Sequence, residues 1–146
     1  MFSKEQLLEI FKNTAGKGVV FRYKGDPPFS SNTHHVFIIL YKIPETGELL
    51  LVNGSSKYDK IFKTLNRINL DPHKTLVCIN PGEYNFFPLK TAIDCNTVHE
   101  FSLDSLKIED FEYVIGGEIN DTDMDKIIQG IKNSPSISPR IKELLN

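Results

Sequence analysis

The sequence lacks the short motifs that mark the most familiar catalytic and nucleotide-binding sites. It contains no P-loop and no GxGxxG, GxSxG, HExxH or CxxC pattern. Each of these motifs supplies a phosphate cradle, a nucleophile or metal ligands that its chemistry requires. Two acid–histidine pairs, Asp71 with His73 and Asp94 with His99, also match no strong metal-ligand spacing. The sequence therefore argues against the standard nucleotide, hydrolase and zinc chemistries, and it predicts no metal and no cofactor.

Cysteine is scarce. The two cysteines, Cys78 and Cys95, lie in apolar runs and match neither a zinc nor a redox spacing. Nothing in the sequence calls for a disulfide between them. We therefore expect two reduced, buried cysteines that act as small hydrophobic residues.

Long apolar runs are also missing. No stretch approaches the roughly 20 apolar residues that a membrane-spanning helix needs. The N-terminal segment carries Lys4, Glu5 and Glu9 among its apolar residues, which interrupts the hydrophobic stretch of a signal peptide. The sequence predicts no membrane association and a cytoplasmic location.

The residues that are present are typical of one folded domain. The chain has 146 residues, 40% of them hydrophobic, and ten phenylalanines and five tyrosines supply bulky core residues in the absence of tryptophan. A chain of this length buries roughly 68–70% of the surface that its unfolded form exposes. The net charge of −2 is too small to favour disorder. We predict a single domain over residues 1–146.

Charge is distributed unevenly along the chain. Residues 100–125 contain nine acidic side chains against one lysine, a net charge of −8, whereas residues 57–74 contain five basic side chains against two acidic ones, a net charge of +3. A basic patch is suited to a polynucleotide backbone, although it is also typical of an ordinary solvated helix face. The candidate nucleic-acid-binding residues are Lys24, Lys57, Lys60, Lys63 and Arg67.

Caps, periodicity and turn residues predict the order of elements. Ser3 and Gln6 form a capping-box pattern, and Ser138 followed by Pro139 is typical of a second helix start. Strands are expected at 18–23, 35–42, 48–53, 75–79, 91–96, 98–101 and 111–115, and helices at 4–15, 58–67, in the region 120–133 and after residue 138.

Short strands at close spacing, separated by turn residues, predict a small β-barrel or a strongly curled sheet. The run from Val36 to Leu40 is apolar throughout, as in a strand covered on both faces. The predicted fold class is α+β, mainly β. A barrel would occupy residues 17–118, with an N-terminal helix in residues 1–16 and C-terminal helices in residues 119–146.

Candidate catalytic groups flank the predicted strands. His34 and His35 lie where one predicted strand starts, and because neighbouring strand residues point to opposite faces, at most one is expected in a given pocket. Ser55 and Ser56 end another strand, where a hydroxyl can bind phosphate or position a general acid, and Ser56 also suits the N-cap of the next helix. Arg22 has the planar guanidinium of a phosphate clamp, or is a surface residue of a half-exposed strand.

The order of these segments resembles that of the PemK/MazF-like family of endoribonuclease toxins over roughly residues 17–131. A strand at 18–23 precedes a loop and an apolar strand at 35–40, and the next strand ends in the small residues Gly54-Ser55-Ser56. Phe86-Phe87 and residues 91–95 look like the family's segment before its late strands. Residues 116–134 look like its closing glycine turn and helix.

The resemblance implies an SH3-like barrel, commonly a homodimer, that cleaves single-stranded RNA without a metal and is paired with an antitoxin protein. In that mechanism the ribose 2′-hydroxyl attacks the adjacent phosphate, and the protein supplies a cation and a hydroxyl or acid–base group. Ser55 or Ser56 matches the family's hydroxyl position.

The sequence departs from the family at one important position. The family's catalytic arginine usually sits in the loop between the first two barrel strands, and the corresponding loop here, from Lys24 to His34, contains no arginine. Lys24, His34 and Arg22 are the candidates to replace it. The N-terminal helix is additional to the family pattern. A catalytically inactive barrel that binds protein or nucleic acid, or a barrel that binds a small ligand, remains an alternative.

Overall fold

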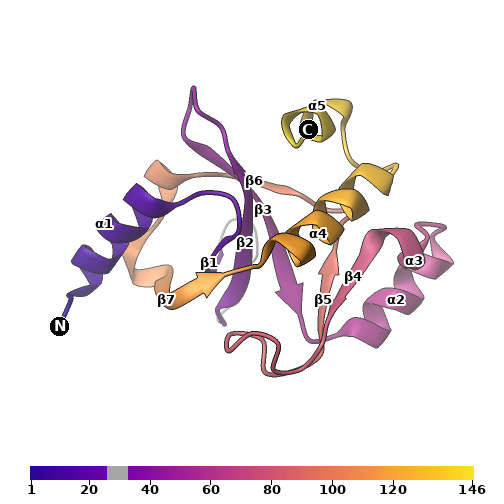
Figure 1. The fold of residues 1–146 in the computed structure, drawn as a ribbon, viewed down its shortest axis with the longest axis horizontal. Helices are drawn as coiled ribbons and strands as arrows, with labels where there is room; N and C mark the ends of the chain where they lie inside the picture. The colour runs from indigo at the N-terminus through magenta and orange to yellow at the C-terminus, as the bar shows by residue number, and fades with distance from the viewer. Residues whose placement is uncertain (26–32) are drawn as a thin grey trace.

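A seven-stranded antiparallel sheet organises the chain in the computed structural model, which describes residues 1–25 and 33–146 (Figure 1). The strands are β1 (Val19–Tyr23), β2 (His35–Lys42), β3 (Glu48–Ser55), β4 (Leu76–Ile79), β5 (Thr91–Asp94), β6 (His99–Ser102) and β7 (Phe111–Glu118). The helices are α1 (Lys4–Thr14), α2 (Tyr58–Arg67), α3 (Pro72–Thr75), α4 (Asp121–Asn133) and α5 (Pro139–Leu144), with 3₁₀ turns η1 (Leu103–Ser105) and η2 (Ile108–Asp110). The predicted α+β, mainly β class is confirmed, including helices at both ends of the chain.

The sheet is open rather than closed into a barrel. Its strands follow the order β4-β5-β3-β2-β1-β7, and β6 pairs with β3 outside this path. Strand β3 serves both halves of the sheet, because Glu48–Leu51 pair with β6 and Gly54–Ser55 pair with β5. The two end strands, β4 and β7, do not pair with each other. Each packs against a helix instead, β7 against α1 and β4 against α4.

Two hydrophobic cores explain the continuous apolar run in β2. Ile38 and Leu40 point into a core formed with α4 and α5, whereas Phe37 and Ile39 point into a core formed with α1. Alternate residues of a strand face opposite sides, so a strand covered on both faces needs apolar residues throughout. Figure 1 shows α1 at one end of the molecule and α2 with α3 at the other.

Most of the predicted helix starts are confirmed by their capping bonds. Ser3 and Gln6 form the reciprocal capping box of α1, and Ser138 caps α5 with Pro139 in its first turn. Asp71 and Pro72 begin the one-turn helix α3, where the Asp71 side chain accepts a hydrogen bond from the His73 amide.

Both cysteines are free, but only one of them is buried as predicted. Cys95 is fully buried, and burial raises the pKa of its thiol to about 12. The prediction for Cys78 is wrong, because β4 is the last strand of the sheet and its Cys78 side chain points to solvent. Within residues 1–25 and 33–146, no helix is both long and apolar enough to cross a bilayer.

Candidate functional site

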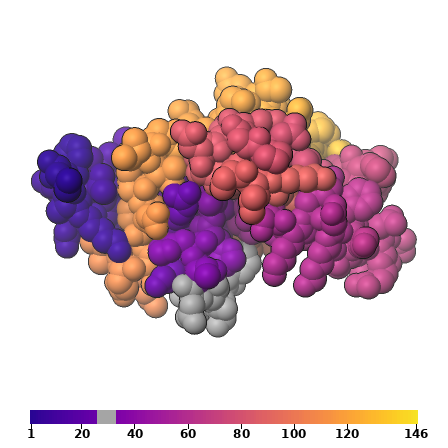
Figure 2. All heavy atoms as spheres, turned by 90° about the horizontal axis from the view of Figure 1, so that it is seen from below, coloured from indigo at the N-terminus to yellow at the C-terminus, as the bar shows by residue number. Residues whose placement is uncertain are grey.

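A cleft of about 630 Å³ opens where β2 begins and β3 ends. We call it the central cleft. In Figure 2 the violet surface of β2, the magenta surface of α2 and the rose surface of the segment after β4 adjoin on the face seen from below. The structure brings five of the sequence-predicted residues to its border: His34, His35, Ser55, Ser56 and Lys57.

Both histidines border this cleft, so the expectation that at most one would do so is wrong. They lie where β2 begins, beside the end of β3. His35 and Phe37 share one face of β2, with ring centroids 6.5 Å apart, whereas His34 points towards Glu112. His34 precedes β2, so the alternation of the strand does not govern its side chain, and both histidines border one cavity.

A third histidine, His99, joins His35 on the same face of the sheet. Phe37 is paired with Asn53 and Leu51 with His99, which places all four side chains on one side. His99 Nε2 lies 3.3 Å from Asn53 Oδ1, and the His99 ring meets the Phe37 ring edge-on with centroids 6.2 Å apart. Both His99 and Asn53 border the central cleft.

Burial lowers the pKa of the His35 and His99 imidazoles, because a charged ring is poorly solvated there. Both rings are therefore neutral near pH 7, and a neutral imidazole can accept a proton. The cleft thus contains two groups suited to general base catalysis.

The two serines differ in their surroundings. Ser55 Oγ accepts a hydrogen bond from the Lys57 amide at 3.2 Å, which turns the chain from β3 towards α2. The N-cap of α2 is Lys57, so the expectation that Ser56 caps this helix is wrong. Ser56 is exposed at the cleft border, and Ser55 alternates with Asn53 on the histidine-bearing face.

An aromatic wall closes one side of the central cleft. Phe86 and Phe87 are buried and pack with ring centroids 4.9 Å apart. Gly54 lets this wall approach β3, because a Cβ at Gly54 would lie 2.6 Å from Phe87 Cε1. Tyr84 anchors the same segment, since its hydroxyl donates to Asp123 Oδ2 at 2.6 Å at the start of α4. The wall is therefore held from two sides.

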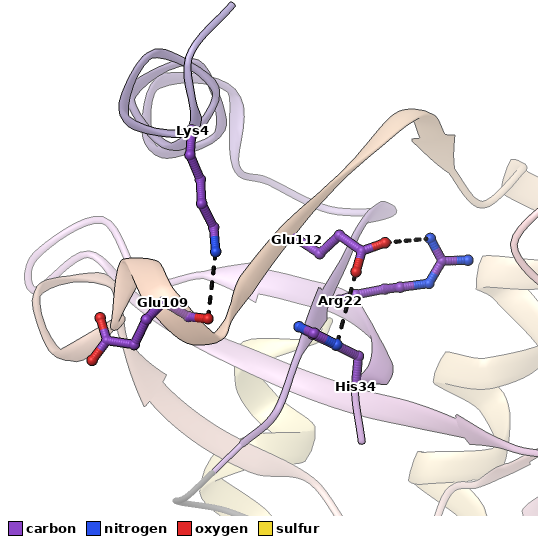
Figure 3. Close-up of polar contacts among 5 residues, drawn as sticks. All are labelled: Lys4, Arg22, His34, Glu109 and Glu112. Carbon is purple, nitrogen blue, oxygen red and sulfur yellow. Dashed lines mark hydrogen bonds and ion pairs between the residues drawn. The ribbon is translucent and has the colours of Figure 1, made fainter. Parts of the chain in front are cut away.

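Arg22 does not border the central cleft and is instead paired with an acid. Figure 3 shows Glu112 between Arg22 and His34, with its carboxylate oxygens 3.5 Å from Arg22 Nη1 and 3.8 Å from His34 Nδ1. Lys4 reaches from α1 to the Glu109 carbonyl oxygen at 3.4 Å. The Arg22–Glu112 ion pair is long and partly exposed, and such pairs contribute about 0–1 kcal/mol. A phosphate can therefore compete with Glu112 for Arg22 at little cost.

The predicted nucleic-acid-binding residues are spread over two regions. Lys57 borders the central cleft, and Lys57 and Lys60 both border a second hollow of about 270 Å³ beside α2, which we call the α2 hollow. Lys63 and Arg67 are exposed on α2 but border neither cavity. Lys24 follows β1, where its amide donates to the Asp110 carbonyl. Residues 26–32 of the loop that follows lie outside the described residues.

Three further residues border the central cleft that were not predicted to share a site, namely Asn53, Asp94 and His99. The spacing of Asp94 and His99 in the sequence indicates neither a metal site nor a shared cavity. Among the described residues, no group of three or more histidine, cysteine or acidic side chains is arranged to hold a metal ion. The sequence does carry a signal for Asn53, because Asn53 is a polar residue that directly follows the apolar run of a strand.

In comparisons with models of known protein families and with curated protein sequences, nothing matches this chain.

Proposed function

We propose that the protein is a metal-independent endoribonuclease that cleaves single-stranded RNA in the central cleft. The observation that carries the proposal is the convergence of His34, His35 and His99 with Ser55 and Lys57 in one cavity, although they come from three separate parts of the chain. Acid–base groups, a hydroxyl and an ammonium cation are the set that phosphodiester transfer to a neighbouring ribose hydroxyl requires.

In this proposal, side chains at the border of the central cleft supply every group that the reaction needs. The ribose 2′-oxygen attacks the adjacent phosphorus, and its proton passes to the neutral imidazole of His35. The bond from phosphorus to the 5′-oxygen breaks, and that oxygen takes a proton from His34. The products are a 2′,3′-cyclic phosphate and a 5′-hydroxyl end. The Lys57 ammonium and the Ser55 hydroxyl bind the phosphate oxygens as negative charge develops on them.

The resemblance to the PemK/MazF-like toxins extends this proposal to partners. It adds a protein antitoxin, a homodimer and a cytoplasmic site of action. The family's arginine is missing from the loop between Lys24 and His34, and in our proposal Lys57 takes its place, because Lys57 is the one lysine or arginine among the described residues that borders the central cleft. Arg22, held by Glu112 beside His34, is the next cation along the sheet.

The test is cleavage of a mixed single-stranded RNA by the purified protein in EDTA. We expect discrete products with 2′,3′-cyclic phosphate ends. His35→Asn and the double variant Ser55→Ala/Ser56→Ala should each cut at least about 100-fold more slowly, because a positioned acid–base group typically contributes 10²–10⁴-fold. His73→Asn and Ser105→Ala change the same residue types at exposed positions away from the cleft and should cut at the wild-type rate.

Two results would overturn the proposal. RNA that stays intact at high protein concentration would do so, and so would cleavage that the His35 and serine variants leave unchanged while circular dichroism shows them folded. RNA that is bound but not cut would favour the alternative, a catalytically inactive module that binds nucleic acid.

A further inference from the structure

Asp94 stands where the central cleft meets the α2 hollow. The two cavities share the side chains of Lys57, Ile61 and Asp94. Asp94 ends strand β5 and is partly buried, so its carboxylate faces both spaces from a rigid element. The ribonuclease reaction described above gives this acid no part.

The orientation of the Asp94 carboxylate is fixed from the core. Its Oδ1 accepts from the Asn96 amide at 2.9 Å and from Asn96 Nδ2 at 3.0 Å. Asn96 is buried, and it is held in turn by Thr75 Oγ1 at 2.9 Å and by the Ser134 hydroxyl at 2.6 Å. Thr75 and Ser134 are themselves almost fully buried. A chain of hydrogen bonds thus presents one carboxylate oxygen in a set direction.

The second oxygen, Oδ2, is left to a ligand. Within the part of the chain that the structure describes, both hydrogen bonds to the Asp94 carboxylate fall on Oδ1, and Asp94 takes part in no ion pair. An ionised carboxylate only accepts hydrogen bonds, and each oxygen has room for two. The site therefore favours a ligand with two neighbouring N–H donors, flanked by the cations Lys57 and Lys60 and by the apolar side chain of Ile61.

The nucleobases of RNA differ in this respect. Guanine carries N1–H and N2–H donors side by side on its Watson–Crick edge, and an oxygen placed between these nearly parallel donors can accept from both. Adenine and cytosine each place one donor beside a ring-nitrogen acceptor, and the lone pair of that nitrogen is repelled by a carboxylate oxygen. Uracil places its one N–H between two carbonyl oxygens. Single-stranded bases are read along this edge in protein–RNA recognition.

We propose that Asp94 is the specificity residue of the central cleft and selects guanine in single-stranded RNA. The guanine edge lies on Asp94 Oδ2, its ring lies against Ile61, and Lys57 and Lys60 bind the flanking phosphates. The inference rests on the proposed function in taking RNA as the ligand, but it concerns binding and not the chemical step.

The experiment measures binding without cleavage. The probes are fluorescein-labelled 2′-O-methyl oligouridines with a single central guanine, inosine, adenine or cytosine, which cannot be cut because the attacking hydroxyl is blocked. We expect the guanine oligomer to bind about tenfold more tightly than the adenine and cytosine oligomers, in the range of one good bidentate contact. Inosine lacks the N2 donor and should fall between them.

The Asp94→Asn variant should lose the preference for guanine, because its side chain can keep an oxygen towards Asn96 and then presents an N–H donor to the base. The matched control is Asp59→Asn, which removes the same charge from an exposed position on α2 that borders neither cavity. It should keep the guanine preference. An unchanged melting temperature for Asp94→Asn shows that the loss is not one of folding.

Equal binding of the four oligomers by the wild type, or a guanine preference that Asp94→Asn retains, overturns the inference. If Asp94→Asn does not fold, equal binding of the guanine and inosine oligomers by the wild type still overturns the inference. Cleavage of unmodified RNA without guanine-selective binding overturns this inference alone. Guanine-selective binding without cleavage overturns the ribonuclease proposal alone.

Discussion

Replacing Gly54 by alanine should destabilise the protein, although the new group is one methyl. The added Cβ would lie 2.6 Å from Phe87 Cε1, 2.9 Å from Phe87 Cζ and 2.9 Å from Thr91 Cγ2. Phe87 and Thr91 are each only 4% exposed, so neither can move aside into solvent. Overpacking of a rigid core typically costs about 1–3 kcal/mol. Alanine also restricts the unfolded chain, which offsets about 0.4–1 kcal/mol of that cost.

The expected net loss is about 1.5 kcal/mol, or roughly 5 °C in Tm for a domain of this size. Urea unfolding followed by circular dichroism measures it, since the chain has no tryptophan to report by fluorescence. The matched background is Phe87→Leu, which removes the ring atoms nearest to the new Cβ. In that background the Gly54→Ala change should cost clearly less. A Gly54→Ala protein as stable as the wild type, or an equal cost in both backgrounds, would refute the packing argument.

Two further predictions concern the groups around the central cleft. Tyr84→Phe should lower the free energy of unfolding by about 1–3 kcal/mol, because the buried Asp123 carboxylate loses a donor at 2.6 Å. Burial, with the nearby Asp123, raises the pKa of Tyr84 to about 12 from 10.0. Because the unfolded chain then loses this proton first, wild-type stability should fall as the pH rises from 10 to 12, and Tyr84→Phe should lack this loss. Parallel curves of Tm against pH for the two proteins would contradict this prediction. Burial lowers the pKa of His99 below its ordinary 6.5, so the unfolded chain takes up this proton first and stability should fall as the pH drops below 6.5. His99→Asn should show a shallower fall in Tm over that range, and an identical slope would mean that His99 does not titrate on unfolding.

Local chemistry made the elements of the chain predictable. The Ser3–Gln6 capping box and the Ser138-Pro139 start depend on residues within one helical turn of each other, and both are present as expected. Strand β2 has the predicted boundaries, because its apolar run faces two cores. The strand ends were less exact: β3 and β7 both extend beyond the predicted residues, since pairing with a neighbouring strand sets where a strand stops.

The candidate site was predictable only in part. His34, His35, Ser55, Ser56 and Lys57 could be chosen from residue type and from their place at the ends of strands, and all of them border one cleft. Arg22 could not be judged in this way, because its partner Glu112 lies 90 residues further along the chain on the adjacent strand β7. Asn53 and His99 meet through the pairing of β3 with β6, which no local pattern specifies.

The sequence by itself therefore determined the fold class, the order of helices and strands and a first set of polar residues, because caps, periodicity and turns act between near neighbours. Tertiary structure alone decided that the sheet stays open, that Cys78 faces solvent and that Asp94 is oriented by Asn96, Thr75 and Ser134. Those outcomes depend on strand register and on helices that dock across the sheet. Such contacts join residues far apart in the chain, where the sequence carries no periodic signal for them.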